Sequence, residues 1–154
     1  MKLSKKSDYA LRTLLTLAQH YGQGPISIRE LARRNDVPKR FLEHIMLELK
    51  ENGWVRSVQG RDGGYVLATA PDALTIGQVV RHFDGVLAPI GCVSVSHHEA
   101  CSQEHVCRFR HVFLEIRNFT ARFMDRTSLA AVQCGEPLTP QESVAQHLVG
   151  GAGI

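Results

Sequence analysis

The 154-residue sequence has no long uninterrupted apolar run, and this absence argues against segments that enter or cross a membrane. Lys2, Lys5 and Lys6 open the chain, but an arginine and two threonines interrupt the apolar residues that follow at 11–18. A secretory signal peptide needs a continuous apolar stretch, and a membrane span needs a longer one. We therefore expect a cytoplasmic protein with no membrane partner.

Catalytic motifs are also missing. The sequence contains no nucleophile elbow, no phosphate-binding loop and no zinc-peptidase motif, so an enzyme is the least favoured class. Only four cysteines are present, and no two of them form a Cys-x-x-Cys pair. This number is too low for a disulfide scaffold. In a cytoplasmic chain it favours reduced ligands, sensor thiols or buried small side chains.

Charge is distributed unevenly along the chain. Residues 1–69 hold twelve Lys and Arg against seven Asp and Glu, whereas residues 70–154 hold six against eight. A basic first half is typical of a surface that meets a polyanion such as nucleic acid. Because the overall charge is only +3, a solvated surface with chance asymmetry stays open as the alternative.

Three amphipathic helices are predicted in this basic half. Apolar residues recur every three to four positions, and glycine, asparagine and proline divide the pattern into residues 4–24, 27–36 and 38–53. Ser27, with Glu30 three positions later, has the pattern of a capping box at the start of the second helix. The second and third helices are separated by a tight turn, which predicts a helix-turn-helix.

The apolar period then changes to that of β-strands. Residues 54–58 and 65–67 predict two short strands, joined by the sequence Gln-Gly-Arg-Asp-Gly-Gly at 59–64. Glycines at this tip permit the positive φ angles of a hairpin turn. The order of elements predicts a mainly α fold with a small β-hairpin wing, that is, a winged helix-turn-helix.

A long helix is predicted from Phe109. Val112, Ile116, Phe119 and Phe123 recur at alternating steps of four and three, which is the spacing of a seam between helices. An ordinary core-facing stripe within one subunit is the alternative. We favour a homodimer interface, because the winged-helix core already has enough helices and oligomers tend toward twofold symmetry.

These elements divide the chain into three parts. Residues 1–70 are predicted to form the winged helix-turn-helix DNA-binding domain, and residues 71–132 the sensor loop and dimerisation helix. A further helix capped by Thr75 opens this second part, and residues 86–108 show no periodicity. Residues 133–154 are predicted to be a poorly ordered tail.

Exposed residues of the helix-turn-helix and hairpin are the predicted contacts to double-stranded DNA. A recognition helix presents its N-terminal exposed residues to base edges in the major groove, and basic side chains meet phosphates. An arginine at a hairpin tip can enter a minor groove. The residues selected in this way are Arg29, Lys39, Arg40, Glu43, His44, Arg56, Gln59 and Arg61. Each alone is more often a solvated surface residue, but together they would flank one duplex.

Three of the four cysteines, Cys92, Cys101 and Cys107, lie within sixteen residues of the aperiodic segment. Thiolates on an irregular loop can converge on a soft metal or an iron–sulfur cluster. The fourth ligand would come from elsewhere, with nearby histidines, Cys134 and Asp8 as candidates. Structural zinc, a reversible thiol–disulfide switch and simple burial stay open as alternatives. For Cys134 the default is a buried structural thiol.

Five runs of the sequence closely resemble the IscR/NsrR family of winged-helix regulators, and the resemblance covers about residues 1–132. The runs are residues 7–12 (Ser-Asp-Tyr-Ala-Leu-Arg), 28–32 (Ile-Arg-Glu-Leu-Ala), 41–45 (Phe-Leu-Glu-His-Ile), 57–65 (Ser-Val-Gln-Gly-Arg-Asp-Gly-Gly-Tyr) and 75–80 (Thr-Ile-Gly-Gln-Val-Val). The hairpin departs from the family pattern, because Arg61 stands where proline is expected. The operator sequence is therefore expected to differ.

The resemblance implies a homodimer whose long helices cross, and it implies that the three loop cysteines ligate a cluster. In the nitric-oxide-sensing branch an aspartate of the partner subunit completes the site, and Asp8 stands at the matching position. In the assembly-regulator branch a histidine three residues after the last cysteine does so, but Arg110 stands there in this chain. Three sulfurs and a carboxylate favour [4Fe-4S] over [2Fe-2S].

The sequence as a whole predicts a DNA-binding transcription regulator, with a repressor favoured. Its operator affinity is expected to be set by an iron–sulfur cluster that senses nitric oxide, oxidants or iron–sulfur status. The alternative is a winged-helix regulator that has no cluster and contains either a thiol–disulfide switch or zinc.

Overall fold

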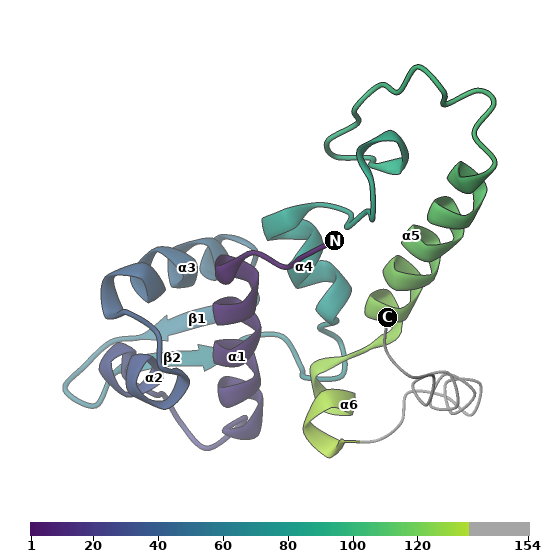
Figure 1. Ribbon diagram of the computed structural model, residues 1–154. Helices are drawn as coiled ribbons and strands as arrows, with labels where there is room; N and C mark the ends of the chain where they lie inside the picture. The colour runs from purple at the N-terminus through teal and green to yellow at the C-terminus, as the bar shows by residue number, and fades with distance from the viewer. Residues whose placement is uncertain (136–154) are drawn as a thin grey trace.

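The computed structural model describes residues 1–135 and confirms a mainly helical fold with one antiparallel hairpin (Figure 1). Residues 136–154, which hold most of the tail expected to be poorly ordered, lie outside the described part. The elements, in chain order, are α1 (Lys5–Gln19), α2 (Ile28–Asn35), α3 (Lys39–Glu51), β1 (Val55–Val58), β2 (Gly64–Leu67), α4 (Ile76–Asp84), the 3-10 turn η1 (Gly91–Val93), α5 (Phe109–Arg126) and α6 (Leu129–Cys134).

Polar side chains set where several of these helices begin. Ser4 caps α1 and Ser27 caps α2, each by accepting the backbone N–H of the residue three positions on. Thr75 forms a complete capping box with Gln78, whose side chain accepts the Thr75 N–H at 2.8 Å. These bonds satisfy backbone donors that the first turn of a helix leaves without partners. Pro38 occupies the N-cap position of α3. The helix therefore begins at Lys39, one residue later than the sequence predicted.

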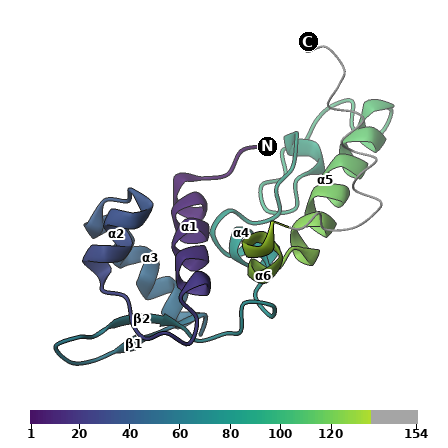
Figure 2. The same cartoon turned by 90° about the horizontal axis from the view of Figure 1, so that it is seen from below.

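The core is built around α1. Figures 1 and 2 show α1 between the helix-turn-helix with its hairpin on one side and α4 and α6 on the other. Leu14 of α1, Leu31 of α2 and the apolar face of α3, including Leu42 and Ile45, are completely buried. These are the positions that the helical apolar period selects, since one face of each helix carries them.

Close backbone approaches fix the hairpin to the rest of the domain. Val55 pairs with Leu67 in the antiparallel register, and Ile26 bridges to Tyr65 through two backbone hydrogen bonds of 3.0 and 2.9 Å. A Cβ atom at Gly64 would collide with the backbone of Ile26. The glycine therefore allows the segment before α2 to lie directly against the hairpin.

The short helix α6 is an element that the sequence interpretation missed. Leu129 is 2 % exposed and belongs to the same apolar core as α1. Backbone hydrogen bonds from Ile76 to Thr127 (2.8 Å) and from Leu129 to Leu74 (2.9 Å) return this part of the chain to the start of α4. Residues 133 and 134 therefore complete a packed helix, and residue 135 follows it.

The C-terminal half of α5 packs on α4 through a glycine. A Cβ atom at Gly77 would lie 2.8 Å from the backbone nitrogen of Asp125, so the two helices touch at this point. Arg81 of α4 donates two hydrogen bonds to the Asp125 carboxylate, at 2.9 and 2.8 Å. The N-terminal half of α5 instead extends away with the segment that carries the cysteines (Figure 1).

The apolar seam predicted along α5 is exposed in the single subunit. Val112, Ile116 and Phe119 are 53, 39 and 57 % exposed, and Phe109 at the start of the helix is 70 % exposed. No residue of α5 is buried. This arrangement contradicts the alternative of a core-facing stripe within one subunit and leaves a contiguous apolar face without a partner inside residues 1–135. None of the helices described is long and apolar enough to cross a membrane.

The contact of Gly77 with α5 generates the first prediction. Gly77→Ala should lower the free energy of unfolding by about 2 kcal/mol, because an added methyl group would overpack the backbone of Asp125. Arg81→Ala removes only a half-exposed ion pair and should cost less than about 1 kcal/mol. Urea unfolding followed by circular dichroism measures both values. A larger loss for Arg81→Ala would contradict packing as the main tie between α4 and α5.

Candidate DNA-binding surface and cysteine loop

The turn between α2 and α3 is held by a buried amide and a left-handed residue. Asn35 donates to the Leu31 carbonyl and accepts from the Thr16 hydroxyl, each at 2.9 Å, so it ties α2 to α1. Asp36 ends α2 with φ at 51°, and the Val37 N–H bonds back to Ala32. Aspartate tolerates this conformation better than most residues. These contacts fix the direction in which α3 leaves the turn.

The predicted base-contacting residues lie on the outer face of α3. Lys39, Arg40 and His44 are exposed and Glu43 is half-buried, while Leu42 and Ile45 on the opposite face are buried. Lys39 Nζ lies 3.4 Å from Glu43 Oε1, so these two side chains form an ion pair along the helix. The helix therefore presents cationic and acceptor groups together at its N-terminal end.

On α2 the arginines differ in what they contact. Arg33 and Arg34 both donate to the Glu30 carboxylate at 2.7 Å, and these hydrogen bonds lower its pKa to about 2. The Glu30 side chain is thus engaged by arginines instead of completing the expected capping box with Ser27. Arg29 is exposed and makes no ion pair within residues 1–135. It remains the cation of α2 that can meet a phosphate.

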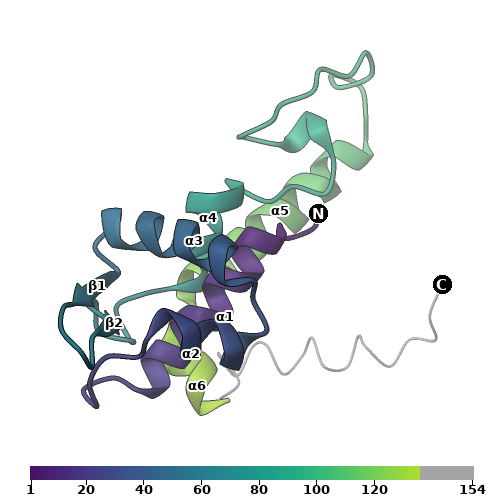
Figure 3. The same cartoon turned by 90° about the vertical axis from the view of Figure 1, so that its left-hand side faces the viewer.

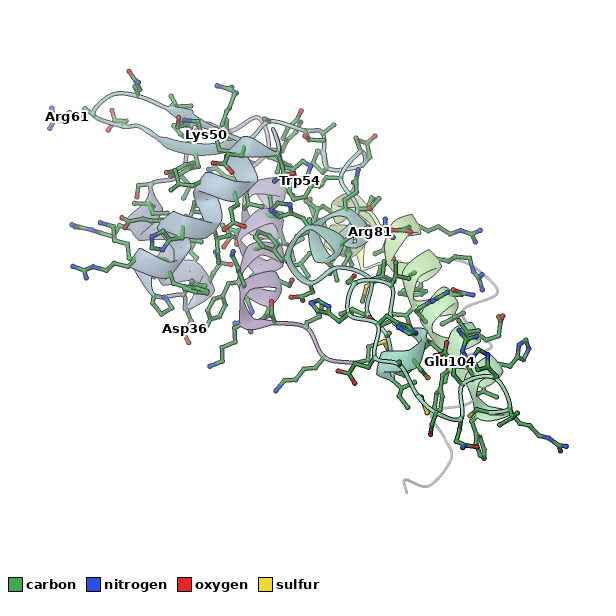
Figure 4. The ribbon with its side chains drawn as sticks, turned by 90° about the horizontal axis from the view of Figure 1, so that it is seen from above. Asp36, Lys50, Trp54, Arg61, Arg81 and Glu104 are labelled. Atoms are coloured by element: carbon green, nitrogen blue, oxygen red, sulfur yellow. The ribbon has the colours of Figure 1, made fainter. Side chains whose placement is uncertain are left out.

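The hairpin carries the remaining predicted contacts. Arg56 lies on β1 opposite Val66, and Gln59 and Arg61 lie in the connecting turn, all three exposed. Arg61 occupies the far tip of the hairpin in Figure 4, at the opposite end of the molecule from Glu104. Figure 3 shows α3 and the hairpin close together, with α2 beside them. All eight predicted DNA contacts therefore lie on one end of the molecule.

A cluster of side chains joins α3 to α1 and α4. Glu48 of α3 contacts Lys6 of α1 at 2.6 Å and His82 of α4 at 3.5 Å. The His82 ring packs edge-on against Trp54, with 5.7 Å between centroids, and against Phe83 at 4.7 Å. We call these five residues the Glu48 cluster. No local pattern in the sequence predicts this cluster, because its members come from three helices and the start of the hairpin.

The three loop cysteines differ in exposure. Cys92 is buried in η1, Cys101 is exposed in the following loop, and Cys107 is half-buried just before α5. All are free thiols. The intervening backbone forms turns but no helix or strand. The irregular conformation expected for this segment is therefore present.

Polar contacts hold the loop against α5. Arg117 donates to the Val93 carbonyl at 2.7 Å and so anchors η1. Glu104 contacts Arg110 at 3.0 Å and His98 at 3.3 Å. Desolvation raises the pKa of the Glu104 carboxyl, but hydrogen bonds from His98 and Arg110 outweigh it and hold the pKa below its usual value. Arg110, which replaces the histidine of one family branch, thus helps to fold the loop.

The structure does not bring the predicted ligands together. In the part of the chain described, no three His, Cys, Asp or Glu side chains lie close enough to hold one metal ion. Asp8 is bound by Arg12 of the same helix through two hydrogen bonds of 2.9 and 2.6 Å. The donor types suit a cluster, but their arrangement in this conformation does not. Cys134, expected to be buried, is exposed at the end of α6, so that expectation is wrong.

Comparison with families and curated proteins identifies the class of the chain. The model of the family Rrf2, described as an iron-dependent transcriptional regulator, matches residues 3–134. A putative HTH-type regulator, rrf2-like, from Rhodobacter capsulatus is 42% identical, covering 74% of this chain and 80% of its own. CymR of Bacillus subtilis is 33% identical over 84% of this chain and 87% of its own. NsrR of Geobacillus kaustophilus is 32% identical over 84% of this chain and 88% of its own.

Solved structures agree with this identification. The structure of CymR, the global cysteine regulator of B. subtilis, is similar with a TM-score of 0.74 and 29% identity, covering 89% of this chain and 99% of that one. IscR of T. potens is similar with a TM-score of 0.66 and 25% identity, covering 99% of this chain and 94% of that one. The predicted class, a transcription regulator and not an enzyme, is confirmed. The chain belongs to the Rrf2 family of transcriptional regulators, the group to which IscR and NsrR also belong.

Proposed function

We propose that this protein is a homodimeric transcription repressor that binds a double-stranded DNA operator and responds to an iron–sulfur cluster held by Cys92, Cys101 and Cys107. The observation that carries this proposal is the placement of two sets of residues at opposite ends of one subunit. The cationic residues of α2, α3 and the hairpin lie at one end, and the loop that carries Cys92, Cys101 and Cys107, marked by Glu104, lies at the other (Figure 4). Membership of a regulator family supports the DNA-binding part.

Operator recognition follows from the chemistry of the exposed end. Arg40 can donate two hydrogen bonds to a guanine, and Glu43 can accept from a cytosine amino group. Lys39, which lies against Glu43, is long enough to turn to a phosphate and free that carboxylate. Arg29 contacts the backbone of the duplex, and Arg61 at the hairpin tip reaches the adjacent minor groove.

Dimerisation gives the exposed face of α5 a partner. Its apolar side chains, including Val112 and Phe119, would otherwise stay in water at a cost of about 25 cal/mol for each Å² of apolar surface. Two copies joined through this helix would carry two copies of α3, one for each half-site. Such dimers bind half-sites about 34 Å apart, one turn of the DNA helix.

The thiols supply the sensory part of the proposal. When bound, the cluster provides iron that reacts with nitric oxide or oxidants. Cys92, Cys101 and Cys107 would hold it, with Asp8 of the partner subunit as the fourth ligand and [4Fe-4S] favoured. Because no three donor side chains of residues 1–135 are placed to hold one metal ion in the described conformation, joint ligation requires the loop to rearrange. The contacts of Glu104 are the ones that such a rearrangement would exchange.

Regulation requires the two ends to be coupled. A signal changes operator occupancy only as far as the two forms of the protein differ in DNA affinity. The contacts that could carry this difference run from α5 to α4 through Asp125 and Arg81, and from α4 to α3 through His82 and Glu48. A shift of α4 would alter the position of the recognition helix through the Glu48 cluster.

A thiol switch without a cluster is the second candidate. The exposure of Cys101 favours it, because an accessible thiol is open to oxidation. Similarity to a protein titled a cysteine regulator also supports a response to sulfur chemistry. In this form of the proposal, oxidation would join two of the loop cysteines in a disulfide, and the oxidant would accept the two electrons and two protons released.

Binding to DNA should depend on salt and on the hairpin tip. Arg61→Ala should weaken binding to a site selected from random duplexes about fivefold, and reduce the slope of log affinity against log salt by about one per subunit. Fluorescence anisotropy at several salt concentrations measures both effects. Arg108→Ala, which removes an exposed cation at the other end of the molecule, should leave the slope unchanged. Equal effects of both substitutions would contradict a specific role of the hairpin.

The cluster hypothesis predicts a protein that is coloured when purified without oxygen. Wild type should contain iron and acid-labile sulfide and absorb visible light, and nitric oxide should bleach it and change operator affinity. Cys101→Ser should lose most of the bound iron and sulfide, because an exposed thiolate ligand is removed. Asp8→Ala should speed loss of the cluster in air without unfolding the chain.

Cys134→Ser is the matched control, since this thiol is also exposed but lies on α6, away from the loop. It should retain the full content of iron and sulfide. A colourless wild type with one zinc per subunit would rule out the cluster. A colourless, metal-free wild type that loses two free thiols on mild oxidation, with a matching change in DNA affinity, would instead establish the thiol switch.

A further inference from the structure

Leu47 is a large apolar residue on the outer face of α3, and neither the fold nor the proposed contacts account for it. Its side chain is 55 % exposed, whereas the same helix buries Leu42, Ile45 and Leu49 and leaves Phe41 38 % exposed. It is absent from the apolar core and from the partly buried residues packed against that core. A single exposed leucine is common on protein surfaces, so its position on the helix is what gives it meaning.

Leu47 lies on the same face as the predicted base contacts. Residues 40, 43, 44 and 47 follow the spacing that places side chains on one stripe of an α-helix, with Leu47 seven residues after Arg40. At about 1.5 Å per residue the two side chains are roughly 10 Å apart along the axis, and the major groove is about 12 Å wide. A helix that inserts Arg40 into the groove therefore keeps Leu47 close to the same groove.

The position of Leu47 on the proposed recognition helix favours DNA as its partner. Arg40 and His44 precede it on this face, and the exposed Lys50 follows it, beside the hairpin in Figure 4. Glu43 and Glu51 also flank Leu47 on the helix, and Arg40 and Lys50 are the cations of this stripe that can meet phosphates. Within the major groove, the C5-methyl group of thymine is the apolar group that base edges offer.

We infer that Leu47 contacts the C5-methyl group of a thymine in each half-site and is a specificity-determining residue of this protein. This inference rests on the proposed function, because it requires α3 to enter the major groove. It extends that function by assigning one base of the operator to one side chain. Cytosine at the same position offers no methyl group, so the contact discriminates between the two pyrimidines.

Replacement of thymine by deoxyuridine tests the contact, because it removes the methyl group and leaves base pairing unchanged. A binding site is first selected with the full-length protein from a pool of random-sequence duplexes. Each thymine of the site is then replaced in turn, and the dissociation constant is measured at fixed salt. At one position per half-site, wild type should bind about fourfold more weakly, the factor expected from one methyl group buried. Leu47→Ala, which removes the contact from both subunits, should bind the original site about sixteenfold more weakly and be insensitive to that replacement.

Val132→Ala is the matched control, because Val132 is 38 % exposed and lies on α6. It should keep the sensitivity of wild type to deoxyuridine. If wild type and Leu47→Ala respond alike at every thymine, the inference fails while the proposed function stands. A change of oligomeric state in Leu47→Ala, seen by size-exclusion chromatography with light scattering, would also overturn it by assigning Leu47 to a protein interface. Failure of wild type to select any site would overturn both.

Discussion

The burial of α1 is the constraint on which the rest of the structure depends. This helix packs against α2, α3, α4, α6 and the hairpin, and its residues Ala10 and Leu14 have no exposed surface. Protein interiors are closely packed, so neighbours of a buried helix shift together more readily than they separate. The proposed recognition helix α3 and the helix α4, which leads to the cysteines, therefore both pack against α1. Their relative position is set by packing within one subunit.

The contacts around Asp8, a proposed cluster ligand, and around Glu104 in the cysteine loop are of a different kind. Asp8 and Arg12 are 42 and 50 % exposed, and the His98 side chain that contacts Glu104 is 50 % exposed. Ion pairs exposed to this degree contribute less than about 1 kcal/mol each. Ligand bonds to iron can displace such pairs, whereas they could not displace the packing around α1. The structure thus combines a closely packed centre with exposed polar contacts whose exchange costs little free energy.

The sequence predicted the parts of the fold that depend on local pattern. Helical apolar periods, serine caps and hairpin glycines are all properties of neighbouring residues, and they identified α1 to α5 and the wing. The helix α6 was missed, because six residues contain too few turns to show a period. The exposure of Cys134 was missed for a related reason, since the surface of α6 depends on which face Leu129 turns toward α1.

In the candidate site, some residues follow from local sequence pattern, and others are brought together only by tertiary packing. Exposure of Arg40 and His44 follows from the apolar face on the other side of the same helix, so the exposed residues of α3 could be named from sequence, and their contact with DNA stays a prediction. The Glu48 cluster could not, because Lys6, Glu48 and His82 are brought together only by the packing of three helices. Spacing also placed three cysteines on one loop without determining whether their sulfurs converge. The distance between thiols depends on non-local contacts such as that of Arg117 with η1.

Coupling between the ends has a consequence that follows from thermodynamics alone. If the state of the loop thiols changes operator affinity by some factor, operator binding must change the affinity of those thiols for their ligand by the same factor. DNA is then an effector of the loop as much as the loop is an effector of DNA binding. The size of this factor is limited by how much the contacts of α4 differ between the two states. Since His82 and Arg81 lie one position apart on that helix, a small rotation of α4 changes its contacts to α3 and to α5 at once.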